Sequence, residues 1–216
     1  MKKIRHFKIP VHHKEIARRI GKAEIALPAA GITDTGALWE FIFGLASELD
    51  AGVVYNSFDK SYAGLDLTGL PAGRMFSAGI VTLGAKPYQK INSYTDTALR
   101  EAGAMAVYEF LETAFDFVTE LIKTEAENEN FELGAPEILF SPQLTEPFEL
   151  KVPDLRFNRK GSPIDQDTIA KALPEVLKEL NAEKIDISFN ADGQITNKLS
   201  VVFLIPWEPR RKTKNR

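Results

Sequence analysis

The sequence predicts a single α+β domain with a largely antiparallel sheet packed by helices. Its 216 residues fit one domain at a soft expectation of about 150 residues per domain. Segments with helical and with strand periodicity follow one another in mixed order, and two strand-like segments near the C-terminus predict a late hairpin. We therefore assign residues 1–209 to this domain and the basic residues 210–216 to a disordered tail.

Composition excludes several kinds of partner and site. The 27 Lys+Arg and 30 Asp+Glu residues leave a formal charge of −3, so we expect no nucleic-acid partner, which would need a clustered basic face. The absence of cysteine excludes thiolate nucleophiles and cysteine metal ligands, and it fits a reducing compartment. Because no apolar run reaches about 18 residues and no secretory signal is visible, we expect a cytoplasmic protein without a membrane partner.

Hydrophobic periodicity predicts the elements of the first half. Leu38, Ile42 and Leu45 recur at spacings of three and four residues, which is typical of an amphipathic helix. Gly21 closes a shorter apolar pattern, as expected just past a helix end. The predicted elements are a strand at 4–11, a helix at 13–20, a helix at 36–50, a strand at 52–58, a loop at 61–73 and a strand at 75–83.

The strongest helical pattern covers residues 95–125. Glu109, Glu112 and Asp116 predict a solvated polar face, although their spacing would also allow them to bind a cationic ligand. Gly103 lies inside this helix, where glycine costs about 1 kcal/mol relative to alanine. Close approach of a ligand or another backbone, or packing of small residues, would each explain it. The opposite, apolar face consists of Leu99, Ala102, Ala106, Phe110, Ala114, Phe117 and Leu121.

The C-terminal part is predicted to be irregular until its end. Residues 137–141 form a short strand, a proline-punctuated loop follows, and residues 165–180 form a helix that is interrupted or restarted at Pro174. Alternating apolar residues at 185–189 and 199–205, joined by a glycine-containing turn, predict the hairpin.

The residues by themselves show no catalytic set. Neither a P-loop nor a Rossmann glycine motif is present, and Ser141 lacks the flanking glycines of a hydrolase elbow. The three histidines are His6, His12 and His13, whose order in the chain does not suit a shared metal ion. A histidine acid–base role would require one of them to reach a pocket.

Several segments carry short motifs that occur in the same order in one known family. They are Ile16–Gly21, Ala78–Gly84, Arg100–Val107, Phe140–Pro142, Leu180–Phe189 and Gly193–Val201. The last two are the most specific, because Lys198 and Ser200 fit the pattern well. Together these segments resemble the activation domain of cobalamin-dependent methionine synthase and its stand-alone bacterial relatives, over about residues 4–206.

This resemblance implies a bent antiparallel sheet and a positioning function. In the family, the domain binds S-adenosylmethionine and presents it to a corrinoid cofactor, so that oxidised cobalamin is remethylated. It supplies no nucleophile, and cobalamin would be reached only through a corrinoid-binding methyltransferase partner. The ligand-binding residues that the resemblance implies are Phe140, Ser141, Pro142 and Gln143 in a loop, Glu101 or Glu109 as the acidic partner of the sulfonium, and Gly103.

The binding loop also departs from the family pattern. Leu139 stands where the family has arginine, Gln143 and Leu144 replace its glycine–tyrosine pair, and Arg100 stands where it has aspartate. These differences keep a second hypothesis open, a docking protein of the same fold that does not bind S-adenosylmethionine. A third hypothesis, an unrelated small-molecule enzyme, would need a convergent set of polar groups that the sequence does not show.

Overall fold

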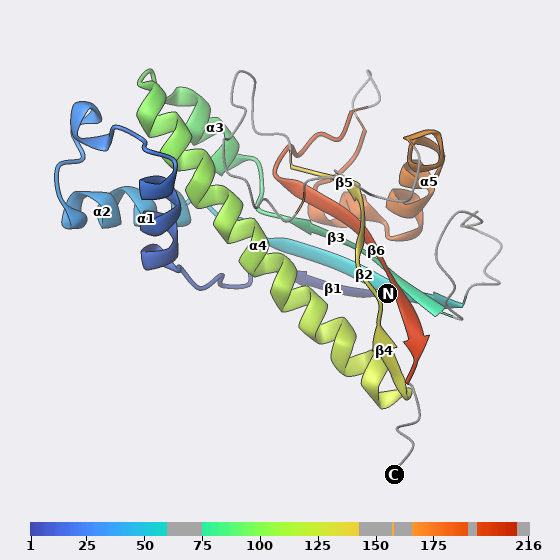
Figure 1. Cartoon of the computed structure of the whole chain (residues 1–216). Helices are drawn as coiled ribbons and strands as arrows, with labels where there is room; N and C mark the ends of the chain where they lie inside the picture. The colour runs from blue at the N-terminus through green and yellow to red at the C-terminus, as the bar shows by residue number, and fades with distance from the viewer. Residues whose placement is uncertain (60–74, 143–156, 158–165, 190–193, 211–216) are drawn as a thin grey trace, which may run out of the picture.

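The structure is a computed structural model that describes residues 1–59, 75–142, 157, 166–189 and 194–210. Within these ranges the chain is α+β, as the sequence predicts, and its strands form an antiparallel sheet (Figure 1). The strand order is β1-β2-β3-β6-β4, and β5 pairs with the same edge of β6 as β4 does. The strands are β1 (Lys2–Arg5), β2 (Gly52–Asp59), β3 (Met75–Thr82), β4 (Phe131–Leu133), β5 (Glu137–Phe140) and β6 (Ser200–Pro209).

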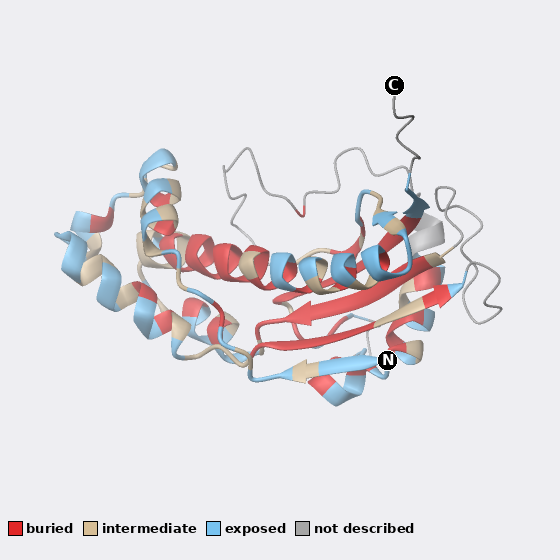
Figure 2. Cartoon of the chain, turned by 90° about the horizontal axis from the view of Figure 1, so that it is seen from below, coloured by how far each residue is buried: buried red, intermediate tan, exposed pale blue. Residues whose placement is uncertain are grey.

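Helices cover both faces of this sheet. Helix α4 runs along one face, with α1, α2 and α3 packed around its N-terminal half, while α5 covers the other face (Figures 1 and 2). The helices are α1 (His13–Lys22), α2 (Thr35–Ala46), α3 (Lys86–Ser93), α4 (Thr97–Asn128) and α5 (Gln166–Glu179), with 3-10 turns η1 (Leu27–Ala30) and η2 (Ala182–Ile185). Among the described residues, no helix is long and apolar enough to cross a lipid bilayer.

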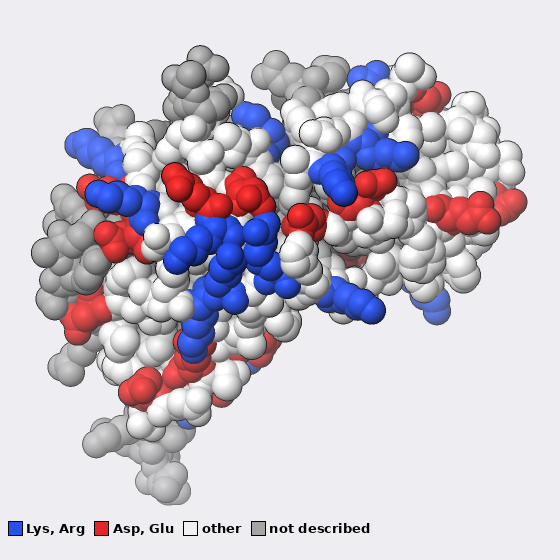
Figure 3. Space-filling model, turned by 180° about the vertical axis from the view of Figure 1, so that it is seen from behind, with Lys and Arg blue, Asp and Glu red and all other residues white. Residues whose placement is uncertain are grey.

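Strand β6 is buried from both sides and separates two cores. Val201 and Phe203 point toward α4, whereas Val202 and Leu204 point toward α5, as the alternation of side chains along a strand requires. At the far edge, β1 presents Lys2, Lys3 and Arg5. Figure 3 shows basic side chains gathered over β1 with acidic ones directly around them. Lysines on an edge strand oppose pairing with a further strand.

Helix α4 departs from the amphipathic expectation. Asp96 caps its N-terminus by accepting a hydrogen bond from the Leu99 N–H at 3.1 Å. Its middle is buried on all sides, so the prediction that Glu109 and Glu112 form a solvated face is wrong, and only Asp116 of the three is exposed. Phe117, predicted on the apolar face, is 41% exposed. Figure 2 shows the buried half of α4 where α1, α2 and α3 pack against it.

Several predicted boundaries are wrong. The strand predicted at 4–11 ends at Arg5, and α5 continues through Pro174, because this proline and Ala170 one turn earlier are exposed and the freed carbonyl meets water. The predicted strand at 185–189 is instead η2 followed by an isolated bridge from Phe189 to Ile195. Helix α3 and strand β4 were not predicted. The predicted loop at 61–73 lies outside the described residues.

The failed hairpin has a local cause. Ile185 and Ile187 are both buried in the core under α5, so their spacing imitates a strand. Asp186 between them has a φ of 59°, which belongs to the left-handed region and not to an extended strand. The return strand therefore pairs with β3 and with β4 and β5 instead.

Candidate functional site

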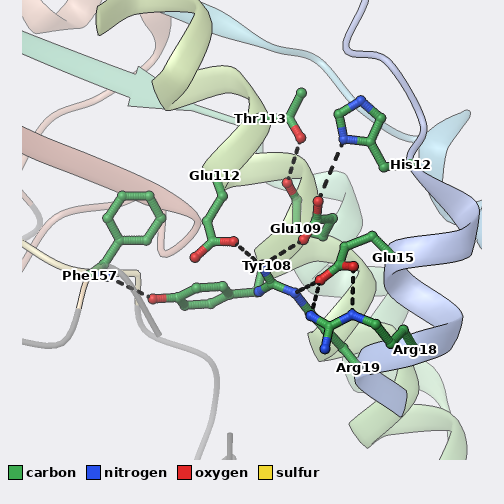
Figure 4. A network of polar contacts seen from close by, with 9 residues as sticks. All are labelled: His12, Glu15, Arg18, Arg19, Tyr108, Glu109, Glu112, Thr113 and Phe157. Atoms are coloured by element: carbon green, nitrogen blue, oxygen red, sulfur yellow. Dashed lines mark hydrogen bonds and ion pairs between the residues drawn. The ribbon is translucent and has the colours of Figure 1, made fainter. Parts of the chain in front are cut away.

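An ionic network joins α1 to the buried middle of α4. Arg19 Nη2 lies 2.9 Å from Glu109 Oε2 and 2.5 Å from Glu112 Oε2, and its Nε lies 3.3 Å from Glu15 Oε1 (Figure 4). Ile16 and Ile20 are buried in the core that α1 shares with α4. Their burial places Glu15 and Arg19, four residues apart on one helix face, against the α4 carboxylates.

Burial and charge set the ionisation of this network. Burial opposes the charge of Arg19, but the hydrogen bond to Glu112 and the charges of Glu112 and Glu109 outweigh it and raise the pKa of Arg19. The hydrogen bond from Arg18 lowers the pKa of Glu15 to about 2. Burial, only partly offset by Arg19, raises the pKa of Glu109. Glu109 therefore takes up a proton more readily than Glu15 does.

Glu109 is also the least satisfied member. Its Oε2 lies in ion-pair range of Arg19 but accepts no hydrogen bond there, while its Oε1 lies 3.6 Å from Nδ1 of the exposed His12. A buried carboxylate oxygen without a hydrogen-bond donor is costly. The arrangement can therefore accept a proton or a cationic group at Glu109.

Tyr108, the residue before Glu109, connects this network to the end of β5. The Phe157 N–H donates to Tyr108 Oη at 3.0 Å, and Ser141 Oγ donates to the Phe157 carbonyl at 2.8 Å. The Phe157 ring is buried, with ring centroids 5.4 Å from Tyr108 and 5.3 Å from Phe115. Figure 4 shows the Phe157–Tyr108 hydrogen bond. Two hydrogen bonds to the Phe157 backbone and two ring contacts thus hold Ser141 beside α4.

The tyrosine hydroxyl stays neutral in this setting. Burial and the charge of Glu112 raise the pKa of Tyr108, whereas the hydrogen bond from the Phe157 backbone acts in the opposite direction. Tyr108 consequently serves as a hydrogen-bond acceptor and not as an acid near neutral pH.

The structure brings only some of the predicted site residues together. Ser141 bonds to the Phe157 backbone, which bonds to Tyr108, the residue before Glu109, and Pro142 follows Ser141. Phe140 instead belongs to the core under α5, on the other face of the sheet. Glu101 is half-buried on α4, about two turns before Glu109. Gln143 and Leu144 lie outside the described residues.

Gly103 has a packing explanation. A Cβ atom there would lie 3.1 Å from Ile91 Cγ1 on α3 and 3.7 Å from both Leu45 Cδ1 and Phe41 Cζ on α2. Three helices therefore meet at this glycine, which is the small-residue packing alternative of the two that the sequence left open.

Glu15, Arg19, Tyr108 and Phe157 are site residues that the sequence did not predict. A signal for the first two was present, because Glu15 and Arg19 are spaced by four residues on a short helix and form a natural ion pair. Tyr108 and Glu109 interrupt a run of apolar residues, which was a second signal of buried polar groups. Phe157 lies in a stretch without periodicity, and no local pattern indicates its contacts.

The described residues hold no group of His, Asp and Glu side chains arranged to bind a metal ion. A scan of the sequence against protein-family models gives no match. A search of curated proteins gives no significant match either. The family resemblance drawn from the motifs therefore stays a prediction, and the chain is assigned to the α+β class alone.

Proposed function

We propose that this protein binds S-adenosylmethionine without covalent chemistry and presents it to a corrinoid cofactor on a methyltransferase partner. The observation that carries the proposal is the Ser141–Phe157–Tyr108 contact, which holds the end of β5 against Tyr108, the α4 residue before Glu109. The motif resemblance assigns the loop contacts of the ligand to the end of β5 and the acidic partner of the sulfonium to α4. In this proposal the protein acts in the cytoplasm, where the corrinoid partner is also placed.

The charge of the α1–α4 network suits a sulfonium. Glu15, Glu109 and Glu112 face Arg19 within one network, and Glu109 keeps an oxygen without a hydrogen bond. A cation placed near Glu109 would gain attraction in a poorly solvated setting and offset the cost of burying that carboxylate. A neutral thioether of the same shape would gain none of this attraction.

The motif segments at the sheet end support the same fold relationship. Ser200 Oγ donates to Thr82 Oγ1 at 3.0 Å, although the two residues are 118 positions apart. The Gly84 N–H donates to the same Thr82 oxygen at 3.2 Å. The resembling segments 78–84 and 193–201 are therefore in direct contact, as two parts of one family signature would be.

Calorimetric titration of the purified full-length chain with S-adenosylmethionine tests the proposal, with S-adenosylhomocysteine as the neutral comparison. We expect saturable binding with a higher affinity for S-adenosylmethionine than for S-adenosylhomocysteine. Glu109→Gln should reduce the difference between these two affinities. Ser141→Ala should weaken binding about tenfold, because the Phe157 backbone loses a hydrogen bond that positions the loop.

Ser93→Ala is the matched control for this experiment. Ser93 Oγ also donates to a backbone carbonyl, that of Lys90 at 2.7 Å, but on α3. Its loss should leave the affinity unchanged. Absence of binding at about millimolar ligand, or equal losses in both serine variants, would contradict the proposal.

One observation favours docking without S-adenosylmethionine as a second candidate function. Leu139, at the position of the family arginine, is 1% exposed in the core under α5. A residue packed there holds no ligand carboxylate. Two aromatic side chains on the outer face of α2, Trp39 and Phe43, are 39% and 51% exposed and offer apolar area to a partner. Failure of the titration would make this function the leading one.

A further inference from the structure

A hollow of about 320 Å³ opens at one end of the sheet, where β2 begins and β3 ends. Its lining includes Asp50 and Thr82 from this sheet end and Asn197 from the segment before β6. Main-chain bonds fix these parts, since the Asp50 N–H donates to the Leu83 carbonyl at 3.0 Å and the Leu83 N–H donates to the Leu199 carbonyl at 3.1 Å. The hollow therefore has a rigid base built from three strands.

Asn197 presents an unused hydrogen-bond donor to this hollow. The residue is 5% exposed, and its Oδ1 accepts a hydrogen bond from the Leu199 N–H at 3.3 Å. Because only an oxygen can accept that bond, the side-chain nitrogen must point the other way. Nδ2 finds no acceptor in the part of the chain that the structure describes. An acceptor from a ligand in the hollow could therefore bond to this nitrogen.

The N-terminus of α3 adds further donors on the same lining. Ala85 is its N-cap residue and has no side chain that could bond the first backbone N–H groups. Lys86 follows, and its ammonium group has no acidic partner among the described residues. A helix N-terminus, a free ammonium group and the Asn197 amide together favour a carboxylate.

The acidic side chains of the hollow decide which kind of carboxylate fits. Asp50 and Asp186 both line it, the first paired with His6 at 2.8 Å and the second with Arg5. Arg5 and Lys86 against Asp50 and Asp186 give the lining a formal charge of zero, two minus two. A phosphate dianion would meet two carboxylates, whereas a ligand with both signs of charge matches the lining.

We propose that this hollow binds a small zwitterion with the carboxylate and ammonium groups of an α-amino acid. The carboxylate accepts hydrogen bonds from Asn197 Nδ2 and from the Lys86 N–H at the start of α3, where Pro87 follows without an N–H, and it lies near the Lys86 ammonium group. The ammonium group faces Asp50 and Asp186. This site uses different elements from the Ser141 and Glu109 site, so it stands or fails independently of the function proposed above.

Titration of the ¹⁵N-labelled full-length protein with L-alanine, followed by NMR, tests the proposal. We expect saturable shifts of the Asn197 side-chain amide and of the Ala85 and Lys86 N–H signals. Propionate and ethylamine, which carry one charged group each, should bind more weakly, and inorganic phosphate more weakly than L-alanine.

Asn197→Asp is the decisive variant. It keeps the oxygen that accepts from the Leu199 N–H, removes the free donor and adds a repelling charge, so the affinity for L-alanine should fall about tenfold or more. Asn130→Asp makes the same change at an exposed position between α4 and β4 and should have no effect. Asp186→Asn should reduce the preference for L-alanine over propionate, because the ammonium group loses a partner.

Three outcomes would overturn the proposal. The first is no shift of the Asn197 amide at about 10 mM L-alanine. The second is an equal affinity of the Asn197→Asp and Asn130→Asp variants for L-alanine. The third is phosphate binding as tight as that of L-alanine, which would indicate a general anion site without selection for the ammonium group.

Discussion

At the residue scale, Gly79 is the position where one methyl group should matter most. It lies opposite Phe203 in the pairing of β3 with β6, and the phenyl ring covers it. A Cβ atom there would lie 2.3 Å from Phe203 Cζ. Gly79→Ala should therefore lower the free energy of unfolding by about 2 kcal/mol, measured by urea denaturation, because the ring must leave its packed position.

Gly44 provides the matched control for Gly79. It lies within α2, and a Cβ atom there would meet nothing within 4 Å. Gly44→Ala should raise the free energy of unfolding by about 1 kcal/mol through helix propensity. The double variant Gly79→Ala with Phe203→Leu should recover part of the loss at Gly79. If Gly79→Ala left the free energy of unfolding unchanged, the Phe203 ring would move at little cost.

At the scale of elements, the pairing of α1 with α4 depends on Arg19. Its side chain is 16% exposed and faces Glu109 and Glu112, two of the most buried carboxylates among the described residues. Arg19→Met would remove the cation that both carboxylates share, which should lower the free energy of unfolding by about 3 kcal/mol. Chemical denaturation measures the loss, and adding Glu109→Gln and Glu112→Gln should restore much of it.

Arg18→Met is the control for this prediction. Arg18 is exposed and pairs with Glu15 on its own helix, so its loss should cost less than about 1 kcal/mol. If the two arginine variants lost equal stability, the ionic network would contribute no more than a surface ion pair. If the triple variant were no more stable than Arg19→Met, the loss would come from packing of the arginine stem instead.

Elements with long periodic patterns could be predicted from the sequence, and contacts between distant segments could not. Leu38, Ile42 and Leu45 indicated α2 correctly because they pack on one side of a helix. The hairpin failed because Ile185 and Ile187 serve a 3-10 turn, whose left-handed residues have no strong local signature. Ser141 was predicted as a site residue, but its Phe157 contact depends on tertiary structure.

At the scale of the whole molecule, two carboxylates of one network should affect the pH dependence of the free energy of unfolding in opposite directions. Burial raises the pKa of Glu109, so the folded state binds a proton more readily than the unfolded chain, and the penalty on its charged form disappears as the pH falls toward 4.5. Arg18 lowers the pKa of Glu15 to about 2 from 4.5, so the stability from its charged form is lost as the pH falls through that interval.

The free energy of unfolding should therefore have a local maximum on the mildly acidic side, just above pH 4.5. Urea denaturation at a series of pH values measures it. In Glu109→Gln the free energy of unfolding should no longer rise as the pH falls from neutral, since a neutral amide carries no charge to bury. Glu15→Gln should instead flatten the fall below pH 4.5. If the free energy of unfolding still rose as the pH fell in Glu109→Gln, the rise would have to come from other groups. Arg19 would then stabilise the charged form of the buried Glu109 as fully as water stabilises an exposed carboxylate.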